Sequence, residues 1–589
     1  MAVKIQLSLS ACQLSVKIEP TDLSGAQAQL VVDIEGQSSL QQDITLDHSP
    51  IIVNFDETPR TGNRHRITAK LTSPVGNAIS GPFLIKLCAS AASPQNFLIL
   101  PTRGIRSTAD HSQTNNAFFR SMSVGISLNS LIHDDIPESA TVLNSTGETG
   151  IKLVQMPENA LTELRAAQPG IRIVPERFYT LQRCLPPTPQ RRVQTMAGNI
   201  AVAGLHLRVT DPAGNPIEGA RVVGFTNFDQ RAGTDGVTNA NGEINLIGLG
   251  NRTLERLYVF PTKNFWSLLR RNILPATGDT LILTPIKPGH IDVRRHFYPD
   301  GAAGSGQGVK VGVIDSGIGP HPDLAVSGGT CTVTGDNTGD FADVDQHGTH
   351  VAGIIAARGQ APNGLRGIAP AASLFAYRVF GRGAEGASNF DIASAIEKAV
   401  ADGCDLINMS LGGGERDEAL EDAITFAFQS GTVCLIATGN DGRQQVSFPA
   451  SFSLALAIGA MGRRGTFPAN TSDTPNALAP FGSPDKKNFV AAFSNIASAE
   501  ASVDLIAPGV AVISTVPGLA GDRAPMSGTS MACPTATGVA ARLLSTRPDL
   551  LALPRDQHRA EEIIKFVTSK AKSLGFGTVF EGLGQFVES

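Results

Sequence analysis

The sequence from about residue 288 onward alternates between continuous apolar runs and amphipathic stretches of helical period. The apolar runs cover residues 309–314, 374–379, 405–410, 432–437, 455–461 and 503–506. Runs that are apolar throughout are typical of parallel strands buried on both faces. Between two of them, Ser388 opens a predicted helix that carries Ile392, Ile396 and Val400 on one stripe. The alternation predicts an α/β fold class, a doubly wound parallel sheet with helices on both faces.

Four polar residues lie where the strands of such a sheet end or its helices begin. They are Asp315, His347, Asn440 and Ser530. Asp315 and Asn440 follow apolar runs, and functional sites in open α/β sheets lie at the carboxyl ends of the strands. His347 opens the segment HGTHVAG, and Ser530 lies in GTSMA, where glycine and small residues leave room for a substrate.

An aspartate, a histidine and a serine can together cleave an acyl bond. A serine hydroxyl is a poor nucleophile at neutral pH without a base. His347 can take the proton of Ser530 and return it to the leaving group, while Asp315 can hold the imidazole tautomer and stabilise the imidazolium. The helix start at Ser530 adds a favourable field for a developing oxyanion. The set predicts a serine hydrolase.

The segments around Asp315, His347, Asn440 and Ser530, in this order, resemble the subtilisin-like serine peptidases, the subtilase family. The resemblance spans roughly residues 288–589. It implies a serine endopeptidase that forms an acyl-enzyme on Ser530, with the Asn440 amide and the Ser530 backbone N–H in the oxyanion hole. Loss of such an amide lowers turnover about 10²–10³-fold, a range that comes from subtilisin itself. The alternative function is a proteolytically silent scaffold that binds peptides.

The same resemblance implies where a substrate binds. Residues 408–413 resemble the sheet-edge segment that pairs with the substrate backbone, so an extended peptide should dock by strand addition. The walls of the P1 pocket would come from Ser410, Leu411, Gly412, Ala437, Thr438 and Gly439. We expect this pocket to favour an apolar residue or one of modest size.

Three acidic residues near these segments have further interpretations. Asp343 and Asp345 precede the predicted base, and basic-specific subtilases use nearby acids to select Arg or Lys at P2 and P4. An acid two residues before the base is nevertheless common throughout the family. Asp323 matches a position that often contributes to a structural calcium site, but Ala361 in the loop 358–364 offers no side-chain oxygen, and calcium needs 6–8 oxygens. We predict no required cofactor and no metal ligand, with structural calcium as the alternative.

The sequence before residue 287 is predicted to form separate modules. Residues 1–104 carry short alternating runs divided by turn signals, which indicates a β-sandwich of unknown role. The polar residues 105–136 indicate a linker. Residues 199–286 form another β block, which resembles the transthyretin-like accessory domain of carboxypeptidases. Residues 287–589 are the predicted peptidase domain.

Residues 137–183 have a compact αβ pattern directly upstream. Their size, order and position resemble the intramolecular inhibitor prodomain of subtilases, and an unrelated small α/β module is the alternative. The residues 184–198, rich in Pro and Arg, form a predicted linker. If the prodomain interpretation holds, the chain is a self-processed zymogen that cuts itself between about Tyr179 and Gly198. An uncut tether is the alternative.

Charge and composition bear on partners and location. A formal net charge of −5 and a pI of about 6.1 give no reason to expect nucleic acid or an anionic membrane. No run approaches the roughly 18–20 apolar residues of a membrane span. Residues 1–10 alternate apolar and polar, unlike a secretory signal, and the seven scattered cysteines form no C-x-x-C pair. We expect a cytoplasmic protease of peptides or proteins, with signal-independent export left open and the N-terminal β domains as candidate docking surfaces.

Overall fold

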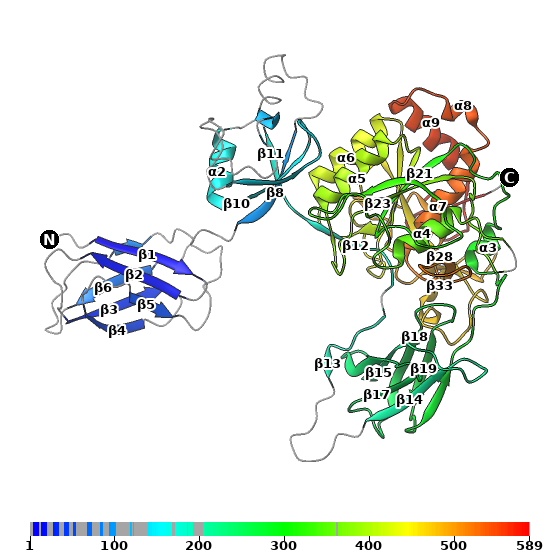
Figure 1. The fold of residues 1–589 in the computed structure, drawn as a ribbon, viewed down its shortest axis with the longest axis horizontal. Coiled ribbons are helices and arrows are strands. Elements are labelled where there is room, and N and C mark those ends of the chain that lie inside the picture. The colour runs from blue at the N-terminus through cyan, green and yellow to red at the C-terminus, as the bar shows by residue number, and fades with distance from the viewer. Residues whose placement is uncertain are drawn as a thin grey trace. The chain divides into compact units, whose positions relative to one another are not determined.

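The structure is a computed structural model of the 589-residue chain. It describes residues 94–101, 118–120, 122, 140–167, 171–184, 186–192, 204–360 and 363–587, together with the backbone of seven strands between residues 4 and 85. The chain divides into two compact units (Figure 1). The first comprises Met1–Thr102 and Arg106–Ile173, and the second comprises Arg103–Ile105 and Val174–Ser589.

Seven strands at the start of the first unit form two antiparallel sheets. One sheet has the order β1-β2-β5 and the other β4-β3-β6-β7. Their bounds are Lys4–Ser10, Gln13–Glu19, Gln27–Ile34, Leu40–Thr45, Ile51–Asn54, Ile67–Thr72 and Phe83–Ile85 for β1 to β7. The side chains that would pack the sheets into a sandwich lie outside the described residues, as does most of the predicted linker 105–136. The sandwich over residues 1–104 therefore stays a prediction.

The rest of the first unit is a small α+β module. Its sheet has the order β11-β8-β10-β9, with β10 antiparallel to both β8 and β9. The elements are β8 (Gln95–Leu100), β9 (Thr141–Ser145), β10 (Lys152–Met156), α2 (Glu158–Ala167) and β11 (Arg172–Pro175). A helical turn at residues 118–120 lies between β8 and β9 in the chain, which gives the order βαββαβ of a split β-α-β fold. Phe97, Val154 and Leu164 share the buried core of this module.

Two predicted boundaries of this region need correction. The strand β8 falls within the predicted first domain, but it pairs with β10 and buries Phe97 and Ile99 in the α+β module. The strand β12 (Phe178–Leu181) falls within the predicted module 137–183, but it pairs with strands of the peptidase domain instead. Both differences have one cause: a strand's partners are chosen by burial across the whole fold rather than by proximity in the chain.

The second unit begins with two sheets that share one apolar core. The larger has the order β13-β16-β15-β18-β19 and the smaller β17-β14-β20. The bounds are Arg191–Arg192, Leu205–Thr210, Arg221–Asn227, Ala232–Val237, Glu243–Leu246, Leu254–Phe260, Leu268–Ile273 and Asp279–Ile282 for β13 to β20. Alternate residues such as Leu207, Val222 and Leu246 point into the core. Trp266 and Ile286 belong to the core of the peptidase domain, so the two domains are joined through packed side chains.

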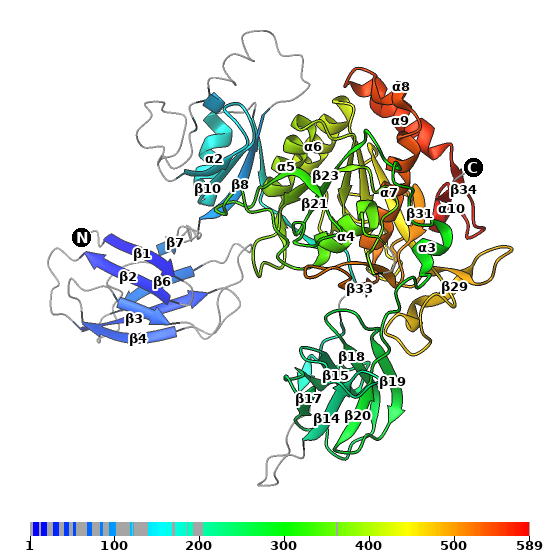
Figure 2. The same cartoon turned by 45° about the vertical axis from the view of Figure 1, so that its right-hand side comes forward.

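The peptidase domain is built on a nine-stranded sheet. The order is β22-β23-β21-β25-β27-β28, after which β31 pairs parallel with β28, and β30 and β29 continue antiparallel. All neighbours from β22 to β28 are parallel. Figure 2 shows α5 and α6 on one side of β21 and β23, with α4 and α7 on the other. The predicted parallel α/β sheet is confirmed for this domain.

The remaining bounds follow the chain. The strands are β21 (Lys310–Asp315), β22 (Val326–Cys331), β23 (Ser373–Arg378), β24 (Ala387–Ser388), β25 (Leu406–Met409), β26 (Leu411–Gly412), β27 (Val433–Ala437), β28 (Ala455–Arg463), β29 (Ala477–Phe481), β30 (Asn488–Ala491), β31 (Leu505–Pro508), β32 (Val512–Thr515), β33 (Arg523–Met526), β34 (Ala571–Lys572) and β35 (Gln585–Phe586). The helices are α3 (Val293–Phe297), α4 (His347–Ala356), α5 (Asn389–Ala401), α6 (Glu418–Gln429), α7 (Thr529–Leu544), α8 (Pro548–Leu551), α9 (Gln557–Thr568) and α10 (Thr578–Glu581), with a 3₁₀ turn at Thr474–Asn476.

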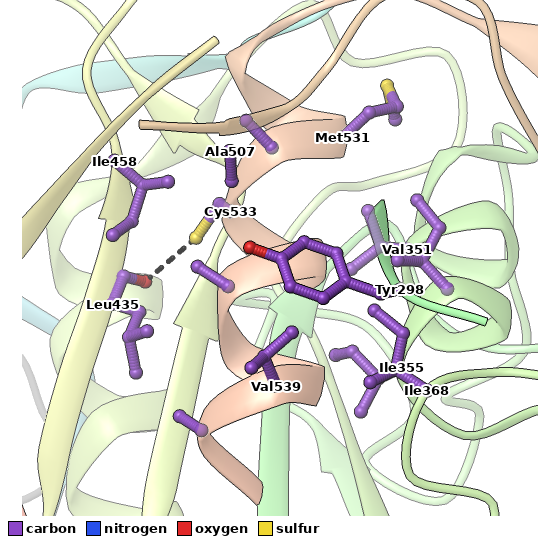
Figure 3. Packing of buried hydrophobic residues seen from close by; sticks show 14 of the residues in the cluster. Tyr298, Val351, Ile355, Ile368, Leu435, Ile458, Ala507, Met531, Cys533 and Val539 are labelled. Carbon is purple, nitrogen blue, oxygen red and sulfur yellow. Dashed lines mark hydrogen bonds between the residues drawn. The ribbon is translucent and has the colours of Figure 1, made fainter. Parts of the chain in front are cut away.

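Helix α7 runs through the apolar core of the domain. Figure 3 shows Met531, Cys533 and Val539 of this helix among side chains from the sheet and from α4. The Cys533 thiol donates to the Leu435 carbonyl of β27 at 3.2 Å. A helix that is apolar all round is typical of a buried position. The start of α7 is therefore held firmly against the carboxyl ends of the strands.

A buried ion pair joins the C-terminal helix α9 to the sheet. Arg559 Nη2 lies 2.6 Å from Asp405 Oδ1, and both side chains are buried. The other Asp405 oxygen accepts from the Lys310 backbone N–H at 2.8 Å. Removal of one partner would leave a buried charge without compensation.

We therefore predict that Asp405→Ala lowers the free energy of unfolding by about 3–5 kcal/mol. Chemical denaturation, with Ser530→Ala in both proteins to prevent proteolysis, measures the difference. The matched control is Asp549→Ala, which removes an exposed ion pair with Arg547 and should change the stability little. Equal effects of the two substitutions would contradict the prediction.

Candidate active site

Three of the predicted residues lie together at one end of the sheet. Asp315 is the last residue of β21, His347 is the first of α4, and Ser530 is the second of α7. All three are fully buried. His347 Nδ1 lies 2.7 Å from Asp315 Oδ1, and the same oxygen accepts from the Ser316 backbone N–H at 2.7 Å. A carboxylate at Nδ1 leaves the other ring nitrogen, Nε2, available as a base.

The position of His347 depends on a second acid, Asp343. Its carboxylate accepts from the backbone N–H groups of Gln346 and Thr349 at 2.9 and 2.8 Å, which caps the start of α4. It also accepts from the Ser316 hydroxyl at 2.9 Å, which links α4 to the residue after Asp315. Burial raises the pKa of Asp343. The sequence pattern suggested only a specificity role for this residue, because a cap formed from a preceding loop leaves no local signature.

Glycine is required directly after the histidine. A Cβ atom at Gly348 would collide with the Gly317 carbonyl oxygen in the turn that follows β21. The Gly348 backbone N–H donates to the Ser316 hydroxyl at 2.9 Å. The close approach of these two chain segments brings Asp315 within reach of His347.

The Ser530 hydroxyl donates to the Ser410 carbonyl at 2.9 Å rather than to His347. His347 Nε2 is buried and, among the residues that the structure describes, has no hydrogen-bond partner. A rotation about the Ser530 Cα–Cβ bond is needed to direct the hydroxyl toward the imidazole. Catalytic hydrogen bonds are often loose before a reaction complex forms.

Asn440 lies beside the start of α7 with its amide oriented by two hydrogen bonds. Its Oδ1 accepts from the Thr529 backbone N–H at 2.9 Å and from the Thr529 hydroxyl at 3.0 Å. The Nδ2 group is buried and unpaired within the described part of the chain. A Cβ atom at Gly528 would collide with the Gln182 carbonyl oxygen and lie 3.3 Å from Asn440 Nδ2. The carbonyl and the amide donor therefore face the same small space.

A segment of the chain itself occupies this space. The strand β12 pairs antiparallel with β24 on one side, Tyr179 opposite Ala387, and with β26 on the other, Thr180 opposite Gly412. The next residue after β12, Gln182, is buried and donates its N–H to the Ser410 carbonyl at 3.1 Å. Its carbonyl accepts from the Ser530 N–H at 2.9 Å.

The same segment continues beyond Ser530. The Cys184 N–H donates to the Ser527 carbonyl at 2.8 Å, so backbone hydrogen bonds lie on both sides of the Gln182–Arg183 peptide bond. The sequence analysis missed this arrangement, because it assigned residues 178–183 to the upstream module. The position of the segment just before a Pro-rich stretch was the only available signal.

The predicted pocket residues divide into two groups. Ser410, Leu411 and Gly412 contact the segment through the backbone pairs just described, with Leu411 opposite Leu181. Ala437, Thr438 and Gly439 form the buried end of β27 and the turn after it. The Gly439 N–H donates to the Thr529 hydroxyl at 3.2 Å, which ties this second group to the start of α7.

The residues considered for metal binding have protein partners. Asp323 Oδ2 accepts from the Leu365 N–H at 2.7 Å. His350 Nε2 lies 3.0 and 3.1 Å from the carbonyls of Ala524 and Val512. Among the described residues, which leave out positions 361 and 362 of the nearby loop, no group of three or more His, Cys, Asp or Glu side chains could hold a metal ion.

Comparison with known proteins identifies the family. A model of the subtilase family matches residues 306–584. Subtilisin BL of Lederbergia lenta is 37% identical over 244 residues, which cover 41% of this chain and 79% of that protein. The chain belongs to the subtilase family. Subtilisin E of Bacillus subtilis (strain 168) is 39% identical over 249 residues, which cover 41% of this chain and 57% of that protein. This subtilase is a serine endopeptidase.

The comparisons also correct one prediction. The expected cytoplasmic location of this subtilase is wrong, because it conflicts with its similarity to subtilisins, which are secreted extracellular proteases. Scattered cysteines and the pattern of residues 1–10 were weak grounds for a location. Over the part of the chain that the structure describes, no helix has the length and apolar character needed to cross a membrane.

Burial of His350 makes the stability of this subtilase depend on pH. Burial lowers the pKa of His350 from 6.5 to about 3. Between these values the unfolded chain binds a proton that the folded chain does not, so stability falls as the pH is lowered. The group contributes about 2 kcal/mol of lost stability between pH 7 and pH 5.

We therefore predict that His350→Gln removes this component of the pH dependence. The measurement is denaturant unfolding at pH 7 and pH 5, with Ser530→Ala in every protein. His206→Gln, at an exposed position on β14, is the control and should keep the wild-type difference. A His350→Gln protein that loses as much stability as the wild type would show that another group titrates.

Proposed function

We propose that this protein hydrolyses peptide bonds through an acyl-enzyme on Ser530, with His347 as general base and Asp315 as its charge-stabilising partner. Asn440 Nδ2 and the Ser530 N–H are the oxyanion donors. The observation that carries the proposal is the Gln182 carbonyl, which accepts from the Ser530 N–H at 2.9 Å and faces the Asn440 amide. A carbonyl held there is polarised toward the charge that develops in the transition state.

The proposed reaction follows from these positions. Ser530 Oγ attacks the carbonyl carbon, and its proton passes to His347 Nε2 while Asp315 holds the Nδ1–H. The tetrahedral oxyanion forms between Asn440 and the Ser530 N–H. When it collapses, the C–N bond breaks and His347 donates the proton to the leaving nitrogen. Water then attacks the acyl-enzyme with the same base, which restores Ser530.

The chain itself supplies every group that this sequence of steps uses, so the proposal includes no required cofactor. Substrates are peptides or proteins bound as an extra strand between β24 and β26, as β12 is bound. Ser410, Leu411, Gly412, Ala437, Thr438 and Gly439 form the proposed P1 pocket. The presence of Gln182 at P1 agrees with a preference for residues of modest size. Nothing in the comparisons supports the alternative of a proteolytically silent scaffold.

We further propose that the chain is a zymogen with residues 95–175 as its inhibitory prodomain. The βαββαβ order of this module supports that assignment. Only Glu176 and Arg177 separate β11 from the strand that enters the cleft. The bond aligned with Ser530 is Gln182–Arg183, which lies within the interval predicted from the sequence. The transthyretin-like sandwich after residue 204 and the N-terminal β domain are proposed as spacers or docking surfaces.

Substitution of the nucleophile tests the enzyme assignment. Ser530→Ala should abolish both fluorophosphonate labelling and hydrolysis of a peptide substrate. Asn440→Ala should lower kcat about 10²–10³-fold with a small effect on KM, the range found for this donor in subtilisin. The control Thr546→Ala, in the turn after α7, should keep full activity. Labelling that persists in Ser530→Ala would contradict the proposal.

Intact mass and N-terminal sequencing test the zymogen proposal. The wild-type chain of 61.6 kDa should yield a C-terminal fragment that begins at Arg183, while Ser530→Ala stays whole. Both proteins are incubated at several concentrations, because a self-cleavage within one molecule has a rate independent of concentration. A new N-terminus elsewhere, or an uncut wild type, would overturn the assignment of the Gln182–Arg183 bond.

A further inference from the structure

The residue after the aligned peptide bond makes a two-point contact with an acid close to the base. Arg183 Nη1 lies 2.6 Å from Asp345 Oδ1, and Arg183 Nη2 donates to Asp345 Oδ2 at 2.8 Å. Two parallel N–H···O contacts of a guanidinium with a carboxylate are charge-assisted and geometrically specific. The two side chains are 24% and 31% exposed, so water screens the pair only in part.

Asp345 is available for such a contact, whereas its neighbour Asp343 is not. The Asp343 carboxylate is used to cap α4 and to bind Ser316. Within the described part of the chain, Arg183 is the one side-chain partner recorded for the Asp345 carboxylate. The Asp345 N–H donates to Asp343 Oδ1 at 2.9 Å, which holds the loop two residues before His347. The carboxylate is thus placed rigidly on the departing side of the bond.

A cleft of about 600 Å³ continues from this contact between the peptidase domain and the β-sandwich. Arg183, Cys184 and Asp345 line its start, and Phe228 and Tyr258 of the sandwich line its far wall. The chain leaves the cleft as an added strand, with the Gln190 N–H bonded to the Arg231 carbonyl and β13 parallel to β16. Residues beyond the cleaved bond therefore have a built path along the surface.

We propose that this protease selects its substrates on the primed side, through recognition of an arginine or lysine at P1′ by Asp345. The proposal rests on the proposed function, because it takes Gln182–Arg183 as the bond aligned for attack. It differs from selection at P2 or P4, since the basic side chain belongs to the leaving half of the substrate. The sandwich supplies the second wall of the primed-side path.

Self-cleavage of the full chain gives the first test. Arg183→Ala should slow the appearance of the C-terminal fragment about tenfold, and Arg183→Glu should slow it further, because a carboxylate then faces Asp345. Combining Arg183→Glu with Asp345→Arg should restore part of the rate lost in either single variant. Additive losses in the double variant, or an unchanged rate in Arg183→Ala, would overturn the proposal.

Peptides supplied in trans give a test that does not depend on self-cleavage. The substrates are internally quenched peptides with the sequence of residues 178–187 and Arg, Lys, Ala or Glu at the position of residue 183. The processed wild type should cleave the Arg and Lys peptides with a kcat/KM about ten times that for Ala, and the Glu peptide least well. In Asp345→Asn the ratio of Arg to Ala should fall to about one, whereas the control Asp549→Asn should keep it.

The outcomes separate this inference from the proposed function. An enzyme that is labelled at Ser530 and cleaves all four peptides equally would overturn P1′ selection and leave the peptidase mechanism intact. A protein that is neither labelled nor active would overturn both. Loss of the Arg-to-Ala ratio in the control as well as in Asp345→Asn would show that the preference does not come from Asp345.

Discussion

The burial of helix α7 is the constraint on which the site depends. Its side chains are apolar or small on all sides, and residues such as Met531 and Val539 lie fully inside the core. Each fully buried side chain of this size contributes about 1.5–3 kcal/mol relative to exposure. The first N–H groups of a helix have no partner within it. A rigidly held helix start therefore presents the Ser530 N–H at a constant place, where it meets the Gln182 carbonyl.

Close backbone approach is the second requirement. Gly348 lies against the Gly317 carbonyl, and Gly528 lies against Gln182, in both cases too close for a side chain. These contacts bring together segments that are far apart in the sequence. The Asp343 cap then keeps the first turn of α4 in register with the end of β21. The imidazole is positioned by these backbone contacts as much as by its own bond to Asp315.

The cleft is an open sheet edge that the chain covers with its own strand. β24 and β26 are two residues long each, so neither offers a long unpaired edge to other proteins. β12 satisfies their backbone groups and continues past Ser530 to Cys184. The departing half of this segment is held separately, by Asp345 and by the edge of the β-sandwich. The two halves of a bound chain are thus stabilised by different parts of the second unit.

The sequence by itself determined the parallel sheet, the order of Asp315, His347, Asn440 and Ser530, and the family resemblance. These follow from local patterns: apolar runs, and functional residues flanked by glycines that close packing requires. Only the tertiary structure decided that β8 belongs with the α+β module, that β12 enters the cleft, and that Asp343 caps α4 while Asp345 binds Arg183. Strand pairing and loop-to-helix contacts depend on burial and on groups distant in the sequence, so no local pattern could specify them.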